Sequence, residues 1–430
     1  MPSPLSRLTT GLKYSSILAR TLVLKNWNEA ASRRYLIESL GSMPGISAKA
    51  AQFMAMKLGE GAHRQDNPVS LEPMPLALVK ARIAAEAPRL HAELLEISEQ
   101  AQVASLGQVH EGLLRSGERV AIKVQFPDLQ KSFDEQLGLL RQVSKAGPPK
   151  KFRFEMEAIL DYFADSLQRE VDYEGEAQRQ MEAARLLPKN KPIVVARVYP
   201  EYSSRTILTQ SYEASSPISR IKERPEEARR ECARALLEYF LHAVFVARSV
   251  HTDPHPGNLG FRTMAPQDGR NYELVLYDFG STMTLTEKDV STLWNLIHAY
   301  QNQRDVVPFD EMVALGFDAQ KLLPLRERLP CLMEKLLEPF CVDRDFDFQS
   351  WNLKDHFESV LGADRWWFRS AGPPWFLMLM RSMQGLVHAL CELKVAVPVK
   401  RILLDLPLEA PKEHAPSVLA QLSPSARGSC

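Results

Sequence analysis

The apolar positions near the start of the chain recur mostly at helical spacing. They do so from about Leu12 to Leu58, and the turn signal Met43-Pro-Gly45 interrupts them. Residues 61–75 have the composition of a loop, and Pro75–Glu86 predicts a further helix. Pro88 then starts the approach to the first strands. The pattern therefore predicts helices ahead of the main body of the chain.

The middle of the chain contains both strand and helix patterns. Gly117–Phe126 is a short β-rich run that contains Lys123 and that Pro127 closes, as expected of a strand. Residues 151–187 form a long helical pattern rich in Glu, Leu and Ala, and we expect a break near Gly175. Two β-type runs follow, Ile193–Val198 and Thr206–Tyr212.

The second half of the chain is mainly helical around one hairpin. Glu226–Val250 predicts a helix, and Leu259–Arg262 with Glu273–Tyr277 predict two strands joined by a turn. The stretch from Thr286 to Leu393 reads as helical, with prolines as punctuation at Pro308, Pro330, Pro339 and Pro373-Pro374. Residues 401–430, rich in Pro, Ala and Ser, predict a loosely held tail.

Composition narrows the class of protein. A chain of 430 residues is too long for one small core, so two or three units are expected. Its 45% hydrophobic and 25% charged residues are ordinary for a compact globular protein. Lys plus Arg equals Asp plus Glu at 53 each, so no global charge favours nucleic acid or an acidic membrane surface. Five scattered cysteines without a C-x-x-C pair fit a reducing compartment and give no zinc signature.

Two observations concern membranes and targeting. No apolar run approaches the roughly 18 residues that a membrane span requires, so the chain is not expected to cross a bilayer by itself. Residues 1–28 carry basic residues and no acid, as mitochondrial presequences do. A basic amphipathic helix lying on the protein body explains the same residues and is the interpretation we favour.

The strongest chemical signal is the segment His251-Thr-Asp-Pro-His-Pro-Gly-Asn258 followed by Asp278-Phe-Gly280. Phosphoryl transfer needs metal ions that bridge phosphates, a cation on the phosphates and a carboxylate near the nucleophile. Asp253 and Asn258 have the spacing of a kinase catalytic loop, in which the Asp acts on the nucleophile and the Asn holds magnesium. Asp278, after an apolar strand, would be the second metal ligand.

Each of these segments also has a purely structural interpretation. The loop alone could be a proline-rich turn, and Asp-Phe-Gly alone is a common tripeptide, but both occur in the expected order with a hairpin between them. His251 and His255 could suggest zinc. The neighbouring Pro254 and Pro256 oppose the helical face that such a zinc-binding pair needs, so we favour a role in holding the loop.

A strand lysine completes the set. Val120-Ala-Ile-Lys123 matches the kinase strand whose lysine pairs with nucleotide phosphates and a helix glutamate, although a solvated edge-strand lysine is the bland alternative. No G-x-G-x-x-G precedes it; Gln102-Val-Ala-Ser-Leu-Gly-Gln-Val-His110 stands there, and only Gly107 is free to take unusual dihedrals. A P-loop enzyme is excluded because no G-x-x-x-x-G-K-[ST] occurs.

Together these residues resemble the UbiB-type atypical kinases, a protein-kinase-like family associated with ubiquinone biosynthesis. The resemblance runs from about Gly45 to Leu390. It rests on the motifs above and on three further stretches: Ala104-Ser-Leu-Gly-Gln-Val-His110, Glu170-Val-Asp-Tyr-Glu-Gly-Glu-Ala177 and Arg381-Ser-Met-Gln-Gly385. It implies an α+β, two-lobed protein-kinase-like fold with an N-terminal helical extension and a helix-rich C-terminal lobe. The implied segments are 1–95 (extension), 96–213 (N-lobe), 214–400 (C-lobe) and 401–430 (tail).

The resemblance also implies roles for individual residues. Lys123 would pair with Glu176, and Glu170 with Asp172 would form an E-x-D element that faces an N-terminal lysine. The nucleotide would lie against the loop of Ala104, Ser105 and Gly107. The family's N-terminal K-x-G-Q signature restrains protein phosphorylation; here it reads Lys49-Ala-Ala-Gln52, with alanine in place of glycine.

The implied activity is binding of ATP or ADP with Mg2+ and hydrolysis or transfer of the γ-phosphate, with Asp253 as base and Asn258 and Asp278 as metal ligands. The implied partners are an isoprenoid lipid or a quinone-biosynthesis complex, at a membrane surface or in the cytoplasm, and in mitochondria if the source is eukaryotic. Two alternatives stay open: a nucleotide-gated scaffold without turnover, and a small-molecule phosphotransferase with the same Asp-x4-Asn loop.

Overall fold

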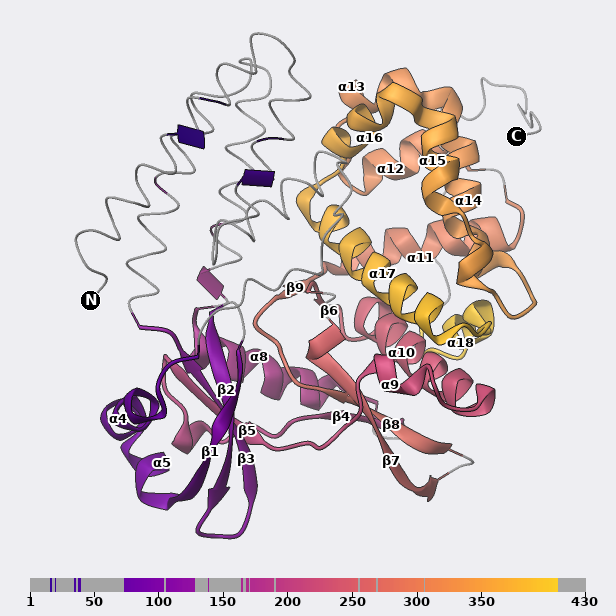
Figure 1. Cartoon of the computed structure of the whole chain (residues 1–430). Helices are drawn as coiled ribbons and strands as arrows, with labels where there is room; N and C mark the ends of the chain where they lie inside the picture. The colour runs from indigo at the N-terminus through magenta and orange to yellow at the C-terminus, as the bar shows by residue number, and fades with distance from the viewer. Residues whose placement is uncertain are drawn as a thin grey trace. The chain divides into compact units, whose positions relative to one another are not determined.

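The fold is taken from a computed structural model (Figure 1). It describes residues 16–17, 20, 35, 38–39, 73–103, 106–127, 138, 164, 168–169, 171–188, 191–253, 256–267, 270–304 and 306–408. The chain forms two compact units. The first unit comprises Met1–Met181 and Ala196–Tyr212, and the second comprises Glu182–Val195 and Glu213–Cys430.

An antiparallel sheet of order β1-β2-β3-β5 organises the first unit. Its strands are β1 (Leu94–Val103), β2 (Gly107–Leu114), β3 (Arg119–Gln125) and β5 (Ile207–Ser211). The short helices α4 (Leu76–Glu86) and α5 (Pro88–Glu93) precede them. Pro88 occupies the first helical position of α5, where its missing N–H costs nothing, and this short helix leads to β1.

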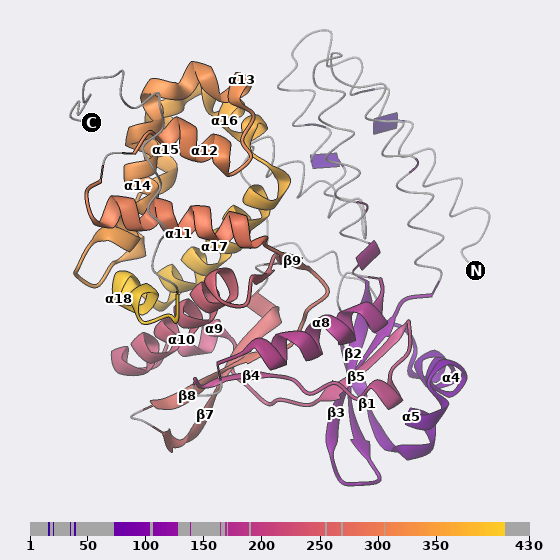
Figure 2. The same cartoon turned by 180° about the vertical axis from the view of Figure 1, so that it is seen from behind.

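The two faces of strand β3 meet different helices, as its alternating side chains require. Val120, Ile122 and Val124 are fully buried and pack with residues of α4 and α5. Lys123 points to the opposite face, where it meets helix α8 (Tyr173–Leu186), which lies along the sheet in Figure 2. The sheet therefore has an apolar core on one side and a polar contact with α8 on the other.

Helix α8 begins at a carboxylate cap. The Asp172 side chain accepts a hydrogen bond from the backbone N–H of Gly175 at 3.1 Å, as an N-cap does. The break predicted near Gly175 is confirmed, because Val171 and Asp172 are not helical and α8 begins at Tyr173. Gly175 itself lies inside the first turn of α8. A Cβ on Gly175 would stand 2.6 Å from Asp172 Oδ2, so glycine is the residue that fits beneath the cap.

The second unit contains two small sheets. β7 (Leu259–Gln267) and β8 (Arg270–Leu276) form the predicted antiparallel hairpin, and β4 (Ile193–Val195) pairs with β8 in parallel. β6 (Ser249–His251) and β9 (Thr282–Thr284) form a separate antiparallel pair. This pair matters for the site because β6 leads into His251–Asn258 and β9 follows Asp278–Gly280.

Helices make up the rest of the described part of the second unit. They are α9 (Ile218–Ile221), α10 (Glu226–Phe245), α11 (Glu287–Gln301), α12 (Pro308–Ala314), α13 (Ala319–Leu322), α14 (Leu329–Cys341), α15 (Leu353–Leu361), α16 (Arg365–Ala371), α17 (Pro374–Leu393) and α18 (Val399–Leu404). Short 3-10 turns connect several elements, at Pro200–Tyr202, Pro256–Asn258, Leu323–Arg328, Phe348–Ser350 and Gly362–Asp364. None of the helices in the described ranges is long and apolar enough to span a membrane.

Two helix boundaries differ from the sequence pattern. The helix predicted to reach Val250 ends at Phe245, and Arg248 takes a left-handed φ of 54° before strand β6 begins. Pro339 was expected between helices but lies inside α14. Pro330 and Pro374 instead start helices, where the fixed φ of proline suits the first turn.

Candidate active site

In the first unit, a buried ion pair joins β3 to α8. Lys123 Nζ lies 2.9 Å from Glu176 Oε1 and 3.0 Å from Oε2. The Glu176 side chain is 0% exposed and that of Lys123 is 18% exposed. At this burial the pair is shielded from solvent, so each charge depends on the other. The structure thus brings together the lysine and the glutamate expected to align nucleotide phosphates.

Tyr173 also bears on this pair, and the sequence reasoning gave it no role. Its ring centroid lies 4.9 Å from Lys123 Nζ, within the range of a cation–π contact, and its side chain is fully buried. It is the first residue of α8, one turn before Glu176. The ammonium of Lys123 is therefore fixed by two residues of the same helix. The sequence feature that could have predicted this contact is a tyrosine one helical turn before the glutamate.

Gly107 lies where strand β2 approaches β3. A Cβ at this position would stand 2.4 Å from the carbonyl oxygen of Val124 and 3.0 Å from Tyr173 Oη. Real side chains do not tolerate contacts that short, so only glycine allows this approach. Position 107 therefore requires glycine because β2 packs closely against β3.

The other residues predicted for this half of the site are only partly described. Ala104 and Ser105 of the nucleotide loop, Glu170 of the E-x-D element, and Lys49 with Gln52 of the N-terminal signature lie outside the described residues. Asp172 is described, and it caps α8 through the backbone of Gly175. Its expected contact with Lys49 stays a prediction.

In the second unit, the catalytic-loop residues Asp253 and Asn258 contact each other. Asn258 Nδ2 donates to Asp253 Oδ2 and to the Asp253 backbone oxygen, both at 3.2 Å. Because its amide nitrogen faces Asp253, the amide oxygen of Asn258 is directed elsewhere and is the atom suited to a cation. Both side chains are half-buried.

The Asp-Phe-Gly segment is tied to the same loop. Asp253 N donates to His251 Nδ1 at 3.3 Å, so the proton of a neutral His251 ring is on Nε2. Nε2 can then donate to the Asp278 backbone oxygen 2.7 Å away. The Asp278 carboxylate accepts from Gly280 N at 2.9 Å. His251 therefore bridges the two segments that carry the predicted metal ligands, which is the holding role favoured from sequence.

Helix α17 supports the loop from more than a hundred residues further along the chain. Ser382 Oγ donates to the His251 backbone oxygen at 2.6 Å, and Ser382 is 8% exposed. Arg381 lies 3.5 Å from Asp253 Oδ1. The sequence reasoning used Arg381-Ser-Met-Gln-Gly385 only as a mark of the family and gave neither residue a role. The sequence feature that could have predicted these contacts is a pair of polar residues within an otherwise apolar helical run.

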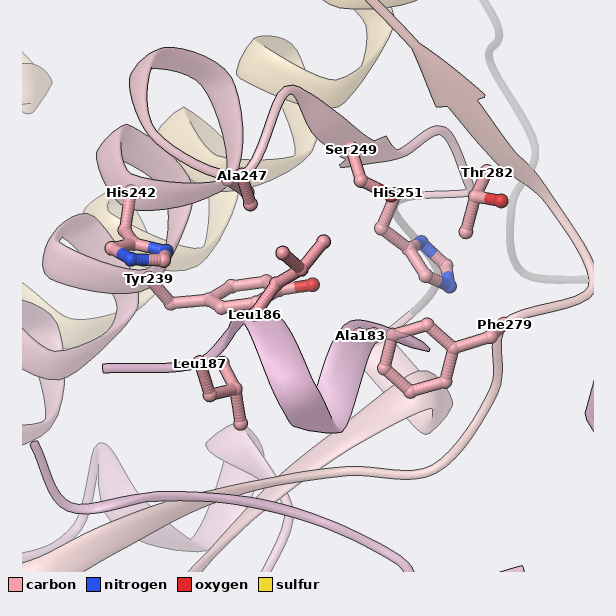
Figure 3. Close-up of a pocket in the computed structure, with 11 residues that line it drawn as sticks. Ala183, Leu186, Leu187, Tyr239, His242, Ala247, Ser249, His251, Phe279 and Thr282 are labelled. Carbon is pink, nitrogen blue, oxygen red and sulfur yellow. The ribbon is translucent and has the colours of Figure 1, made fainter. Parts of the chain in front are cut away.

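A cavity in the second unit lies directly behind His251 and Phe279 (Figure 3). The last turns of α8 and α10 line it, together with Ser249 and Thr282. Burial lowers the pKa of His242 and raises the pKa of Tyr239. Both groups are therefore neutral near pH 7, and neither places a charge next to the segments that carry the predicted metal ligands.

The chemistry of the donor set fits magnesium. Asp253 and Asp278 offer carboxylate oxygens and Asn258 an amide oxygen, which are the hard ligands that Mg2+ prefers. Within the described ranges, no cluster of three or more His, Cys, Asp or Glu side chains is placed to hold a metal ion. Magnesium at phosphate sites takes one or two protein ligands, with phosphate oxygens and water completing the shell. The residues present thus fit an ion that arrives with a nucleotide.

The fold and these motifs define a class of protein: an α+β, two-lobed, protein-kinase-like chain. Residues 70–308 match the model of the ABC1 atypical kinase-like domain. Because this match covers more than half of the chain, the chain belongs to that family, and the resemblance to UbiB-type kinases is confirmed.

Similar curated proteins support this membership. The mitochondrial atypical kinase coq-8 of Caenorhabditis elegans is 31% identical over 194 residues, which cover 45% of this chain and 25% of that protein. The mitochondrial atypical kinase COQ8 of Saccharomyces cerevisiae is 26% identical over 263 residues, covering 60% of this chain and 51% of the relative. The matches thus span about half or less of these relatives.

One solved structure resembles most of the chain. It is the Mycobacterium tuberculosis protein Rv3197, determined in complex with erythromycin. The TM-score is 0.59 at 19% sequence identity, covering 90% of this chain and 97% of that one. This similarity establishes a shared fold, and the predicted fold class is confirmed.

Proposed function

We propose that this chain binds ATP or ADP with Mg2+ and hydrolyses or transfers the γ-phosphate. The observation that carries the proposal is the hydrogen-bonded cluster of Asp253, Asn258, His251 and the Asp278 backbone, which gathers the oxygen donors of a kinase-type metal site in one unit. The ion pair of Lys123 with Glu176 supplies the cation that such chemistry needs for the phosphates.

Each residue would contribute in a different way. Lys123, oriented by Glu176 and Tyr173, would position phosphate oxygens. Asn258 and Asp278 would hold magnesium, which supplies neutralisation of phosphate charge when it is bound. Asp253 would orient the attacking group and take its proton. Ser382 and His251 would fix the loop through backbone atoms.

One observation favours the rival function, a nucleotide-gated scaffold without turnover. Both carboxylate oxygens of Asp253 already have donors nearby, Asn258 Nδ2 at 3.2 Å and Arg381 Nη2 at 3.5 Å. A carboxylate whose two oxygens both face donors is held in place and is less available to accept a proton from a substrate. Such a site could bind nucleotide and change conformation without fast chemistry.

Phosphate release by the purified chain separates these functions. Wild type should release phosphate from ATP, while Asp278→Asn and Asp253→Asn should lose about a hundredfold or more in rate, as expected when a charge-stabilising group is removed. Asp405→Asn, an exposed aspartate at the end of α18, is the matched control and should behave as wild type. Equal release by all four proteins would contradict enzymatic turnover and favour the scaffold.

We further propose that the client process is quinone or isoprenoid-lipid metabolism, with a lipid or a biosynthetic complex at a membrane surface as partner. The support is the family membership and the mitochondrial COQ8 kinases among its relatives. Lipid extracts of a strain lacking this gene should show an altered quinone profile. An unchanged profile would count against this process while leaving nucleotide chemistry intact.

We also propose that Lys49 and Gln52 restrain the site by acting on Glu170 and Asp172. Membership of the family and the presence of both residue pairs in the chain support this. Lys49→Ala should raise phosphorylation of the chain itself relative to wild type. The same level of autophosphorylation in both proteins would contradict the restraint.

A further inference from the structure

The buried face of α8 is unusually polar for a helix packed on a sheet. Its buried residues are Tyr173, Glu176, Ala177 and Gln180, which recur at the spacing of one helix face. Burying a polar side chain costs free energy unless its hydrogen bonds are made. The burial of Glu176 is explained by its ion pair with Lys123. Gln180, 0% exposed and one turn further on, is not explained by phosphate binding.

Gln180 makes two short hydrogen bonds. Its Nε2 donates to the backbone oxygen of Ala196 and to Oε1 of Gln210, each at 2.6 Å. The carbonyl of Ala196 can only accept, so the amide orientation of Gln180 is fixed. Gln180 Oε1 is buried and has no hydrogen-bond partner among the described residues. Burying this oxygen without a partner costs about 1–3 kcal/mol, which offsets stability that the two donated bonds contribute.

These three residues lie where the chain passes between its two compact units. The crossings are at Met181/Glu182, Val195/Ala196 and Tyr212/Glu213. Gln180 lies one residue before the last residue of the first stretch, Ala196 begins the second stretch of the first unit, and Gln210 lies two residues before its end at Tyr212. The amide of Gln180 therefore joins three points of the first unit that lie near its crossings to the second unit.

We propose that Gln180 and Gln210 form a positioning pair that fixes the register of α8 on the sheet, so that Glu176 stays paired with Lys123. Register Lys123↔Leu208 and Ala121↔Gln210 places Gln210 on the same face of the sheet as Lys123. Glu176 and Gln180 are four residues apart on α8, so they form two successive rungs between helix and sheet. The second rung prevents a rotation or slide of α8 that the ion pair alone would permit.

This inference rests on the proposed nucleotide site only for its functional consequence. Gln180→Met keeps the shape of the side chain and removes the donor; Gln210→Met removes the acceptor. Gln178→Met is the matched control, because Gln178 is exposed on the same helix. Without nucleotide, hydrogen exchange at the backbone amides of α8 should be faster in both test variants than in wild type or the control.

With nucleotide, each test variant should bind Mg-ATP about tenfold more weakly, and the double variant should be no weaker than either single one, as coupled residues behave. A merely structural role predicts a lower melting temperature with unchanged nucleotide affinity, and that result would overturn the proposal. Hydrogen exchange at α8 and Mg-ATP affinity equal to those of the Gln178→Met control would also overturn the proposal. If wild type binds no nucleotide, the proposed function fails, but hydrogen exchange still tests the positioning role. If Gln180→Met does not fold, the Gln210→Met variant tests that role instead.

Discussion

The predicted site residues fall into two sets, one in each unit, and the two sets are held by different means. In the first unit, Lys123 and Glu176 are buried side chains that face each other across a sheet and a helix. In the second unit, Asp253 and Arg381 keep about a third of their side chains exposed, and backbone groups of Asp278 and His251 carry much of the bonding. In the first unit, a substitution at the predicted site residues should therefore reduce stability as well as the proposed function. In the second unit, a substitution should be able to remove the proposed function from an intact fold.

Lys123→Met should give the largest loss of stability. It leaves the carboxylate of Glu176 fully buried without its cation, and removing one partner of a buried pair costs about 3–5 kcal/mol. Urea denaturation of the variant and wild type measures this.

The matched control for that variant is the double variant Lys123→Met with Glu176→Leu. It leaves no uncompensated charge and should recover much of the lost stability, without restoring nucleotide binding. A Lys123→Met chain as stable as wild type would show that the pair is not shielded from solvent as the geometry indicates.

Gly107→Ala should have the next largest effect. The added methyl would lie 2.4 Å from the Val124 oxygen, so β2 has to move away from β3, and overpacking of this kind costs about 1–3 kcal/mol. Gly138→Ala, where nothing lies within 4 Å of the new methyl, is the control. Equal melting temperatures for the two variants would contradict the close approach.

Ser382→Ala should separate stability from the proposed function most clearly. It removes one hydrogen bond to the His251 carbonyl and should cost only about 1 kcal/mol in stability. Phosphate release should nevertheless fall several-fold, because the loop that carries Asp253 loses its support. Ser291→Ala, which removes a hydroxyl bond on the exposed side of α11, should change neither quantity. A Ser382→Ala chain with full activity would mean that α17 does not position the loop.

The smallest expected effect is a dependence of the stability of the second unit on pH. Burial lowers the pKa of His242 from 6.5, so the unfolded chain binds that proton more readily and stability falls as pH drops below about 6.5. Burial alone would raise the pKa of Glu238, but hydrogen bonds from Arg270 and Arg234 reverse this, so its net pKa lies below 4.5. A second loss therefore begins below about pH 4.5.

Denaturation midpoints at pH 7.5 and 5.5 test the first of these windows. The difference between them should be smaller in His242→Gln than in wild type, while His91→Gln, an exposed histidine of α5, should keep the wild-type difference. An unchanged difference in His242→Gln would show that His242 is not the group that titrates.

The sequence predicted contacts between residues that are close along the chain and missed contacts between residues that are far apart. Asp253 and Asn258 are close along the chain, so their spacing alone predicted that they belong together. The strand of Lys123 followed from its local pattern, while its pairing with Glu176 came only from family resemblance. Ser382 reaches His251 from a distant helix, and Gln180 reaches Gln210 through the register of α8 on the sheet. Single-sequence periodicity carries no information on such contacts, although it did predict the break near Gly175, where Asp172 caps the start of α8.

The central claim, that Asn258 and Asp278 make this chain a magnesium-dependent nucleotide site, is tested most directly by calorimetric titration of ATP with and without Mg2+. Wild type should bind ATP tightly only when Mg2+ is present, and Asp278→Asn should lose most of that dependence while staying folded. ATP binding by wild type that is equally strong in EDTA, or a full magnesium dependence in Asp278→Asn, would contradict the account.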